Sequence, residues 1–156
     1  MNPRLNILFL CTGNSCRSQM AEGWTRALKG DLIEAYSAGV ETHGLNPITV
    51  EVMAEAGVDI SGHRSKHLDE LGDIAFDMVI TVCDHAREAC PFFPGAKKML
   101  HAGFADPPAM ARDLAAQGAG VEAQRECYRR VRDEIRAYVE TLPGALNLDV
   151  HEDHTC

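Results

Sequence analysis

Short apolar runs alternate with amphipathic segments along this chain. The apolar runs predict four buried strands, over residues 5–10, 32–38, 77–82 and 97–100. Apolar residues at helical spacing predict helices between and after them, over residues 17–28, 47–56, 68–71, 109–116 and 121–142. Strands that alternate with helices favour a parallel sheet, so we expect a single-domain α/β fold with a four-stranded parallel sheet and helices on both faces.

We expect one folded domain over residues 1–148 with a flexible tail at 149–156. The formal net charge of −8 disfavours nucleic acid or an anionic membrane surface as a partner. No apolar run has the length of a signal peptide or a membrane span. Six cysteines in a chain of this length are more typical of working thiols in a reducing cytoplasm than of a secreted disulfide framework, so we expect a cytoplasmic protein.

The first predicted strand ends in a loop whose composition suits an oxyanion. From Leu10 to Ser18 the sequence is L-C-T-G-N-S-C-R-S, and the next helix begins within it. A strand-to-helix turn of small residues lets backbone N–H groups converge on an anion, and Arg17 adds a planar guanidinium. The same field favours the nucleophilic thiolate of Cys11. We therefore predict a nucleophile inside an oxyanion cradle; the alternative is a structural cysteine in an ordinary glycine turn.

Two further groups follow later strands, at the edge of the sheet where ligands gather. Cys83 ends the third strand and Cys90 precedes Pro91. On a helix the two thiols would be about 10.5 Å apart along the axis, so a disulfide would require the helix to loop out. Two unrelated half-buried cysteines are the alternative, and the spacing does not suit zinc. Asp106, in a stiff Asp-Pro-Pro loop, is either a general acid or the cap of the next helix.

These residues closely resemble those of the thioredoxin-coupled arsenate reductases, which share the fold of low-molecular-weight protein tyrosine phosphatases. The shared stretches are Cys11–Trp24, Tyr36–Pro47, Cys83–Pro91, Gly103–Pro107 and Arg130–Ile135. The segment from Pro108 to Gln124 is longer than the family pattern, and the tail from Asp149 is unmatched.

The resemblance implies a role for each of these groups. Cys11 would attack arsenate, Ser18 would lower the pKa of that thiol through a hydrogen bond, and Asp106 would protonate the leaving oxygen. Cys83 would then attack the adduct, releasing arsenite and leaving a Cys11–Cys83 disulfide, which Cys90 would convert to Cys83–Cys90. The residues that would hold the oxyanion are Thr12, Gly13, Asn14, Ser15, Cys16 and Arg17.

The resemblance also implies the partners of the reaction. Arsenate would be the substrate, with phosphate or sulfate as analogues, and reduced thioredoxin would be the external reductant. We expect no bound cofactor, no metal ion and a monomer. In relatives that bind potassium, the ligands match Asn14, Glu22 and Ser37, together with an acidic residue where this chain has Lys66. An ammonium group paired with Glu22 can stand in for potassium, so we expect potassium to be dispensable; a solvated lysine is the alternative.

A phosphatase that forms a phospho-enzyme on Cys11 is the nearest rival, because arsenate and phosphate have nearly the same shape. Phosphatases of this fold usually carry an aromatic residue after the Asp-Pro pair, where this chain has Pro108, and they need no shuttling cysteines. A non-catalytic oxyanion or thiol sensor would not need Asp106. We expect Cys16 and Cys127 to be packed, and a metal role for the tail residues His151, His154 and Cys156 is disfavoured by the entropy of ordering a flexible end.

Overall fold

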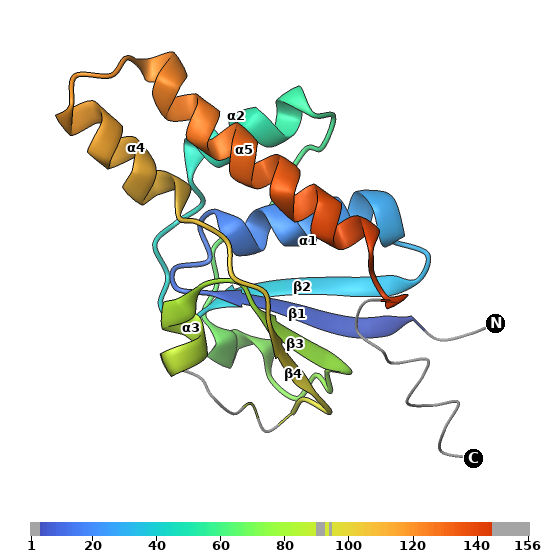
Figure 1. The fold of residues 1–156 in the computed structure, drawn as a ribbon. Helices are drawn as coiled ribbons and strands as arrows, with labels where there is room; N and C mark the ends of the chain where they lie inside the picture. Colours follow the sequence, from blue (N-terminus) through green and yellow to red (C-terminus); the bar gives the residue numbers. More distant parts are fainter. Residues whose placement is uncertain (1–3, 90–92, 94, 145–156) are drawn as a thin grey trace.

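The computed structural model describes residues 4–89, 93 and 95–144, and it contains a four-stranded parallel sheet (Figure 1). The strands are β1 (Leu5–Cys11), β2 (Ile33–Gly39), β3 (Met78–Thr81) and β4 (Met99–His101), in the spatial order β2-β1-β3-β4. β1 is therefore central, and its Leu8 pairs with Tyr36 on one side and with Val79 on the other. Residues 7–10 are completely buried, as expected for a strand covered on both faces.

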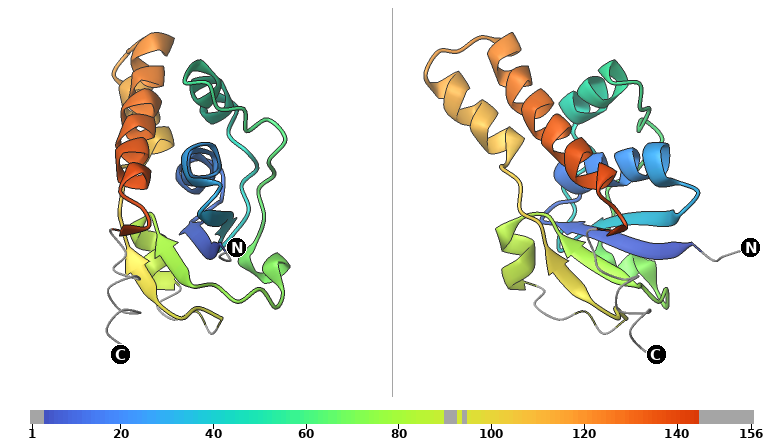
Figure 2. Two further views of the ribbon diagram at one scale, coloured as in Figure 1. Left: turned by 90° about the vertical axis from the view of Figure 1, so that its right-hand side faces the viewer. Right: turned by 45° about the vertical axis from the view of Figure 1, so that its right-hand side comes forward.

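Helices lie on both sides of this sheet but are unequally divided between them. They are α1 (Arg17–Lys29), α2 (Pro47–Glu55), the 3₁₀ helix η1 (Leu68–Leu71), α3 (Asp84–Ala89), α4 (Pro107–Ala116) and α5 (Val121–Glu140). Figures 1 and 2 show α1, α2, α4 and α5 stacked on one side, whereas η1 and α3 lie on the other. The predicted parallel sheet with helices is confirmed, with the longer helices gathered on one face.

The face opposite α1 is sealed by aromatic rings as well as by short helices. Strand pairing places Tyr36 on the face away from Ser37, and Ser37 contacts α1 through Glu22. The ring of Phe76 packs edge-on against Tyr36 at 5.3 Å and against Phe93 at 5.7 Å between centroids. Edge-to-face packing of this kind fills the area that a long helix would otherwise cover.

Several predicted boundaries shift in the structure. β4 begins two residues later than predicted, and α5 ends at Glu140 rather than at residue 142. α4 begins at Pro107 because two prolines fit the first helical turn, where no backbone N–H is needed. The sequence pattern did not predict α3, which follows Cys83 directly. The predicted tail at 149–156, with its His151, His154 and Cys156 group, lies outside the described residues, as does Cys90.

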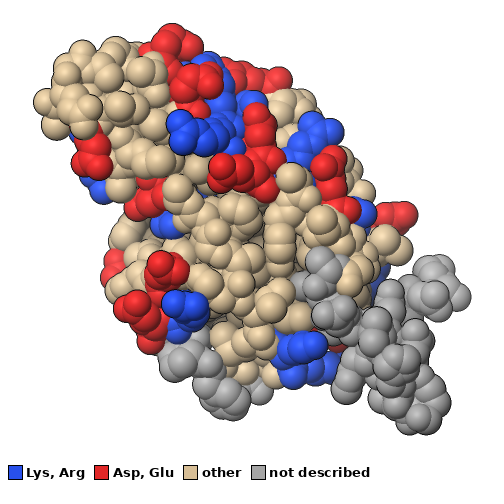
Figure 3. Space-filling view, in the orientation of Figure 1, with Lys and Arg blue, Asp and Glu red and all other residues tan. Residues whose placement is uncertain are grey.

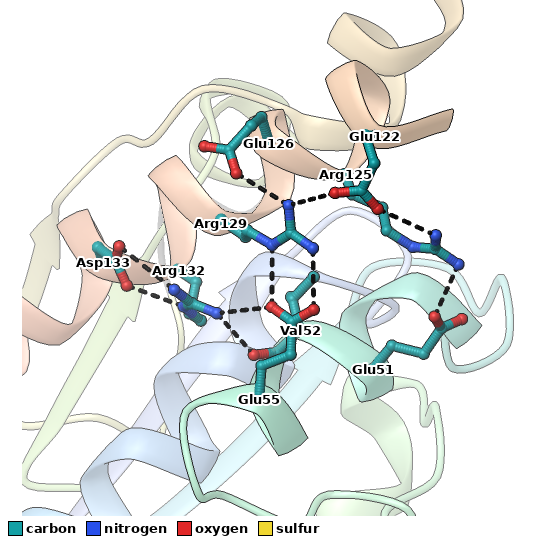
Figure 4. Close-up of polar contacts among 9 residues, drawn as sticks. All are labelled: Glu51, Val52, Glu55, Glu122, Arg125, Glu126, Arg129, Arg132 and Asp133. Atoms are coloured by element: carbon teal, nitrogen blue, oxygen red, sulfur yellow. Dashed lines mark hydrogen bonds and ion pairs between the residues drawn. The ribbon is translucent and has the colours of Figure 1, made fainter. Parts of the chain in front are cut away.

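Arginines of α5 fasten α2 to the rest of the fold (Figure 4). Arg129 binds both carboxylate oxygens of Glu55 at 2.9 Å, and Arg125 binds Glu51 at 2.9 Å. Figure 3 shows acidic and basic side chains interleaved over the part of the surface where Figure 1 places α5. Within the described part of the chain, no helix is long and apolar enough to span a membrane.

Candidate active site

The loop of residues 11–18, which we call the anion loop, joins the end of β1 to α1 at the carboxyl edge of the sheet. Four of its carbonyl groups accept hydrogen bonds from the segment after β2, at 2.9–3.2 Å, and the donors are the backbone N–H groups of Val40, Glu41, His43 and Asn46. Gly39 lies against the same loop: a Cβ there would be 2.8 Å from both the Asn14 nitrogen and the Thr12 oxygen. The end of β2 therefore shapes the loop backbone.

Asn14 connects the anion loop to its surroundings. It adopts a left-handed conformation with φ of 50°, which asparagine tolerates better than most residues. Its Nδ2 donates to Ser18 Oγ at 2.8 Å, and its Oδ1 accepts from the Lys66 backbone N–H at 2.9 Å and from Gln19 Nε2 at 3.0 Å. Asn14 is fully buried, so these bonds hold the loop against α1 and the segment around Lys66.

Cys11 is the one described thiol of the anion loop that favours ionisation. Its pKa is lowered to about 6, because Cys83 donates a hydrogen bond to its sulfur, Arg17 lies nearby and Ser18 also donates hydrogen bonds. These effects outweigh burial, which leaves Cys11 only 3% exposed. Burial raises the pKa of Cys16 to about 12, so that thiol stays protonated and packed. Cys16 is buried, as predicted, and the role of Cys11 as the nucleophile stays a prediction.

Cys83 reaches the anion loop from the end of β3. Its Sγ lies 3.2 Å from Thr12 Oγ1 and accepts from the Ala86 backbone N–H at 3.4 Å. The hydrogen bond to Cys11 and burial both raise the pKa of the Cys83 thiol. Cys11 and Cys83 are both free thiols. The structure thus brings together two cysteines that are 72 positions apart in the sequence.

Arg17 has a buried hydrogen-bonding group that no atom of the described residues satisfies. Its Nη1 donates to the Phe104 carbonyl at 3.0 Å, and its Nη2 lies 3.8 Å from Asp106 Oδ1. The side chain is only 12% exposed, and its Nε is buried without a hydrogen-bond partner among the described residues. A buried unpaired N–H is costly, so this donor fits an oxyanion in the cradle.

Asp106 occupies the N-cap position of α4, but its side chain makes no capping hydrogen bond to described residues. The carboxyl group is instead 44% exposed and turned toward Arg17. The structure therefore does not support the alternative that Asp106 serves only as a helix cap. A carboxyl group in this place can exchange a proton with a ligand in the cradle.

Two cavities meet at these groups. A cavity of about 250 Å³ contains Cys11, Gly13, Ser15 and Arg17 of the anion loop. A cavity of about 550 Å³ lies beside it and is lined by Thr12, Arg17, Cys83 and Asp106, among other residues. The smaller cavity is also lined by His43 and Arg112, which the sequence pattern did not single out. His43 packs closely on Gly13: a Cβ added at Gly13 would lie 2.2 Å from Nδ1 of His43.

The predicted cation group surrounds the buried carboxylate of Glu22, which is 4% exposed. Ser37 Oγ donates to Glu22 Oε1 at 2.5 Å, and Lys66 Nζ lies 4.0 Å from the same oxygen. Arg26, one helical turn along α1, binds the other oxygen at 2.8 Å. Arg26 was missed, although its i,i+4 spacing from Glu22 was a usable signal.

Asn14 does not join this group as predicted, since its side-chain oxygen is already bonded to Lys66 N–H and Gln19. His63 lies on the far side of Glu22, with its Nε2 4.0 Å from Oε2. Burial lowers the pKa of Lys66 and of His63. Over the described ranges, no group of three or more His, Cys, Asp and Glu side chains is arranged to hold a metal ion.

Comparison with known proteins gives one consistent family. The family model for low molecular weight phosphotyrosine protein phosphatases matches residues 6–152. An arsenate reductase of Halalkalibacterium halodurans is 45% identical over 143 residues, covering 91% of this chain and 96% of the relative. A solved arsenate reductase in the phosphate binding state superposes with a TM-score of 0.71 at 30% identity, over 88% of this chain and 95% of that one. A thioredoxin-dependent arsenate reductase of Corynebacterium glutamicum superposes with a TM-score of 0.67 at 26% identity. The match covers 95% of this chain and 64% of that one.

Proposed function

The chain belongs to the low molecular weight phosphotyrosine protein phosphatase family, and within it we propose that this protein reduces arsenate to arsenite. The curated relatives that match most of its length are arsenate reductases. The observation that carries the proposal is the place of the Cys83 thiol, which lies 3.2 Å from Thr12 Oγ1, next to Cys11 in the chain, and lines the cavity beside the anion loop. Hydrolysis of a phosphate ester needs one thiolate in such a cradle, whereas reduction needs a second thiol beside it.

Cys11 begins the reaction as the nucleophile. With a pKa of about 6, it is mostly ionised at pH 7. Its sulfur attacks arsenic, a sulfur–arsenic bond forms, and one arsenate oxygen leaves as water after Asp106 supplies a proton. The unpaired Nε of Arg17 and the anion loop hold the remaining oxygens. Asp106 is the residue assigned to supply the proton, because its carboxyl lines the same cavity as Cys11 and makes no capping hydrogen bond to described residues.

Cys83 acts second because its ionisation depends on Cys11. While Cys11 is a thiolate, its hydrogen bond and its negative charge keep the pKa of Cys83 raised. Once Cys11 is bonded to arsenic, both causes are removed, and the hydrogen bonds from Thr12 and Ala86 favour the Cys83 thiolate. Cys83 then attacks the Cys11 sulfur, a disulfide forms, and the electron pair of the broken sulfur–arsenic bond reduces arsenic to arsenite.

Regeneration requires a further thiol and an external dithiol. In the proposed relay Cys90, which lies outside the described residues, attacks Cys83 and frees Cys11. α3 contains the six residues between Cys83 and Cys90, and we expect this helix to open as the disulfide forms. A reduced thioredoxin then exchanges with the Cys83–Cys90 disulfide, which places the protein in the reducing cytoplasm.

A cysteine series tests this function against phosphatase and sensor alternatives. Cys11→Ser is expected to lose both arsenate-dependent thioredoxin oxidation and aryl phosphate hydrolysis. Cys83→Ser and Cys90→Ser are expected to lose arsenate turnover and to keep aryl phosphate hydrolysis, which needs only the cradle. Arsenate turnover by Cys83→Ser at the wild-type rate would contradict the relay. Aryl phosphate hydrolysis without arsenate turnover in the wild type would identify a phosphatase, and neither activity would identify a sensor.

We also propose that protein cations replace a potassium ion beside the anion loop. Glu22 already has Arg26 at 2.8 Å and Lys66 at 4.0 Å, so its charge is balanced within the protein. A potassium ion placed against the same carboxylate would be repelled by these two groups. Lys66 was predicted for this role from the sequence, and the geometry adds Arg26 to it.

A further inference from the structure

We propose that Arg112 of α4 is a second anion-recruiting side chain of the active site, attracting oxyanions toward Cys11. The inference deepens the proposed function and concerns how its substrate is captured. Arg112 lines the cavity of about 250 Å³ that also contains Cys11 and Arg17. It lies on α4, in the segment between Pro108 and Gln124.

The fold brings α4 over the anion loop. α4 begins at Pro107, immediately after Asp106, and two prolines stiffen its first turn. α4 then packs against α5, and the right view of Figure 2 shows the two helices next to each other. Ala111 is buried while Arg112 is exposed, so the helix turns its small residue inward and its guanidinium toward the cavity.

The charge of Arg112 is available to a ligand. It forms no ion pair within the described part of the chain, in contrast to Arg125 and Arg129 of α5, which are held by glutamates (Figure 4). The protein has a net charge of −8, so an anion that approaches the cavity meets an unfavourable overall field. A local unpaired guanidinium at the rim offsets that field over the screening length of about 10 Å at 0.1 M salt.

Arg112 and Arg17 have different roles because their environments differ. Arg17 is nearly buried and fixed by the Phe104 carbonyl, so it holds the bound oxyanion during the reaction. Arg112 is exposed, and a charge at the rim mainly affects the rate of encounter and its salt dependence. The pKa of Cys11 is set mainly by Cys83, Arg17 and Ser18, so removal of Arg112 should leave the thiolate itself intact.

Two alkylating reagents separate these effects without relying on catalysis. Iodoacetate is an anion and iodoacetamide is neutral, and both react with a thiolate; modification of Cys11 is followed by peptide mapping. Arg112→Ala should slow alkylation by iodoacetate about two- to fivefold, the range for an exposed charge pair. It should leave alkylation by iodoacetamide unchanged. Arg112→Glu should slow iodoacetate further, and Arg112→Lys should restore most of the rate.

The matched control is Arg130→Ala, which removes the same charge from an exposed position on α5 that lines neither cavity. Arg130→Ala should not change either rate, and the Arg112 effect should vanish at about 1 M salt, where the screening length is about 3 Å. An unchanged iodoacetate rate in Arg112→Ala would overturn the proposal. Equal slowing of both reagents, or an equal effect of Arg130→Ala, would do the same.

Turnover gives a second, separate readout. In Arg112→Ala the KM for arsenate should rise by about the same two- to fivefold, with kcat retained, because the charge acts before the chemical step. A fall in kcat with an unchanged KM would overturn the recruiting role. If the wild type proves unable to reduce arsenate, the proposed function fails, while the alkylation experiment still decides whether Arg112 attracts anions to Cys11.

Discussion

The Sγ of Cys83 lies 3.2 Å from the hydroxyl of Thr12, the residue that follows Cys11. Cys83 is also the largest cause of the low pKa of Cys11. One residue thus prepares the nucleophile before it becomes the second reactant. These two roles of Cys83 can be separated experimentally, because its effect on the pKa of Cys11 can be measured in a variant that carries out no turnover.

Replacing Cys83 by alanine removes this effect, so the thiolate of Cys11 loses stabilisation and its pKa should rise above about 6, toward the ordinary value. The measurement is the pH dependence of Cys11 alkylation by iodoacetamide, whose midpoint should move to higher pH. Cys127→Ala is the control, because this cysteine is buried in α5 and lines neither cavity. An unmoved midpoint in Cys83→Ala would show that other groups set the pKa of Cys11.

Gly39→Ala tests how the end of β2 shapes the anion loop. The added Cβ would lie 2.3 Å from the Glu41 oxygen and 2.8 Å from the Asn14 nitrogen, so the loop backbone must shift. Such overpacking typically costs about 1–3 kcal/mol of unfolding free energy. Aryl phosphate hydrolysis should fall at least about tenfold, since small displacements of catalytic groups are costly.

Gly62→Ala is the matched control for this change, because nothing lies within 4 Å of its added Cβ. Its unfolding free energy should stay within about 0.5 kcal/mol of the wild type. Chemical denaturation and aryl phosphate kinetics compare the two variants. Equal behaviour of Gly39→Ala and Gly62→Ala would show that the loop does not depend on the close approach of β2.

Potassium should have no effect on the wild type if Lys66 and Arg26 already balance Glu22. Lys66→Asp removes one cation and adds a carboxylate, so it should lose thermal stability in a buffer of bulky cations and regain it in potassium. Thermal midpoints and arsenate turnover in the two buffers provide the test. A wild type that gains several degrees and turns over faster in potassium would argue against replacement by protein cations.

The α2–α5 ion pairs should contribute to stability through Arg129, which contacts Glu55, Glu122 and Glu126. Arg129→Met should lower the thermal midpoint more than Arg130→Met, its neighbour on the same helix, which has no ion pair to a described residue. The difference should shrink in high salt, because exposed charges are screened. Equal midpoints at low salt would mean that these pairs add nothing to the docking of α2.

The sequence by itself determined the parts of this protein that depend on neighbouring residues. The run of apolar residues predicted β1, and the small residues up to Ser18 predicted an anion loop at the start of α1. Cys11 and Arg17 were identified together because they lie only six positions apart, within one strand-to-helix turn. Local backbone preferences and hydrophobic periodicity decide such features, so a sequence carries them directly.

The sequence also predicted that Cys83 and Asp106 follow strands that end at the sheet edge of Cys11, but only the tertiary structure decided which side chains touch there. Thr12 meets Cys83, and Arg17 meets Asp106, because parallel strands end at one edge of the sheet. Arg26 joins Glu22, and Arg112 reaches the cavity of Cys11, through the packing of α1 against β2 and of α4 against α5. The pKa of Cys11 follows from these contacts, since it depends on distances and burial that no spacing along the chain specifies.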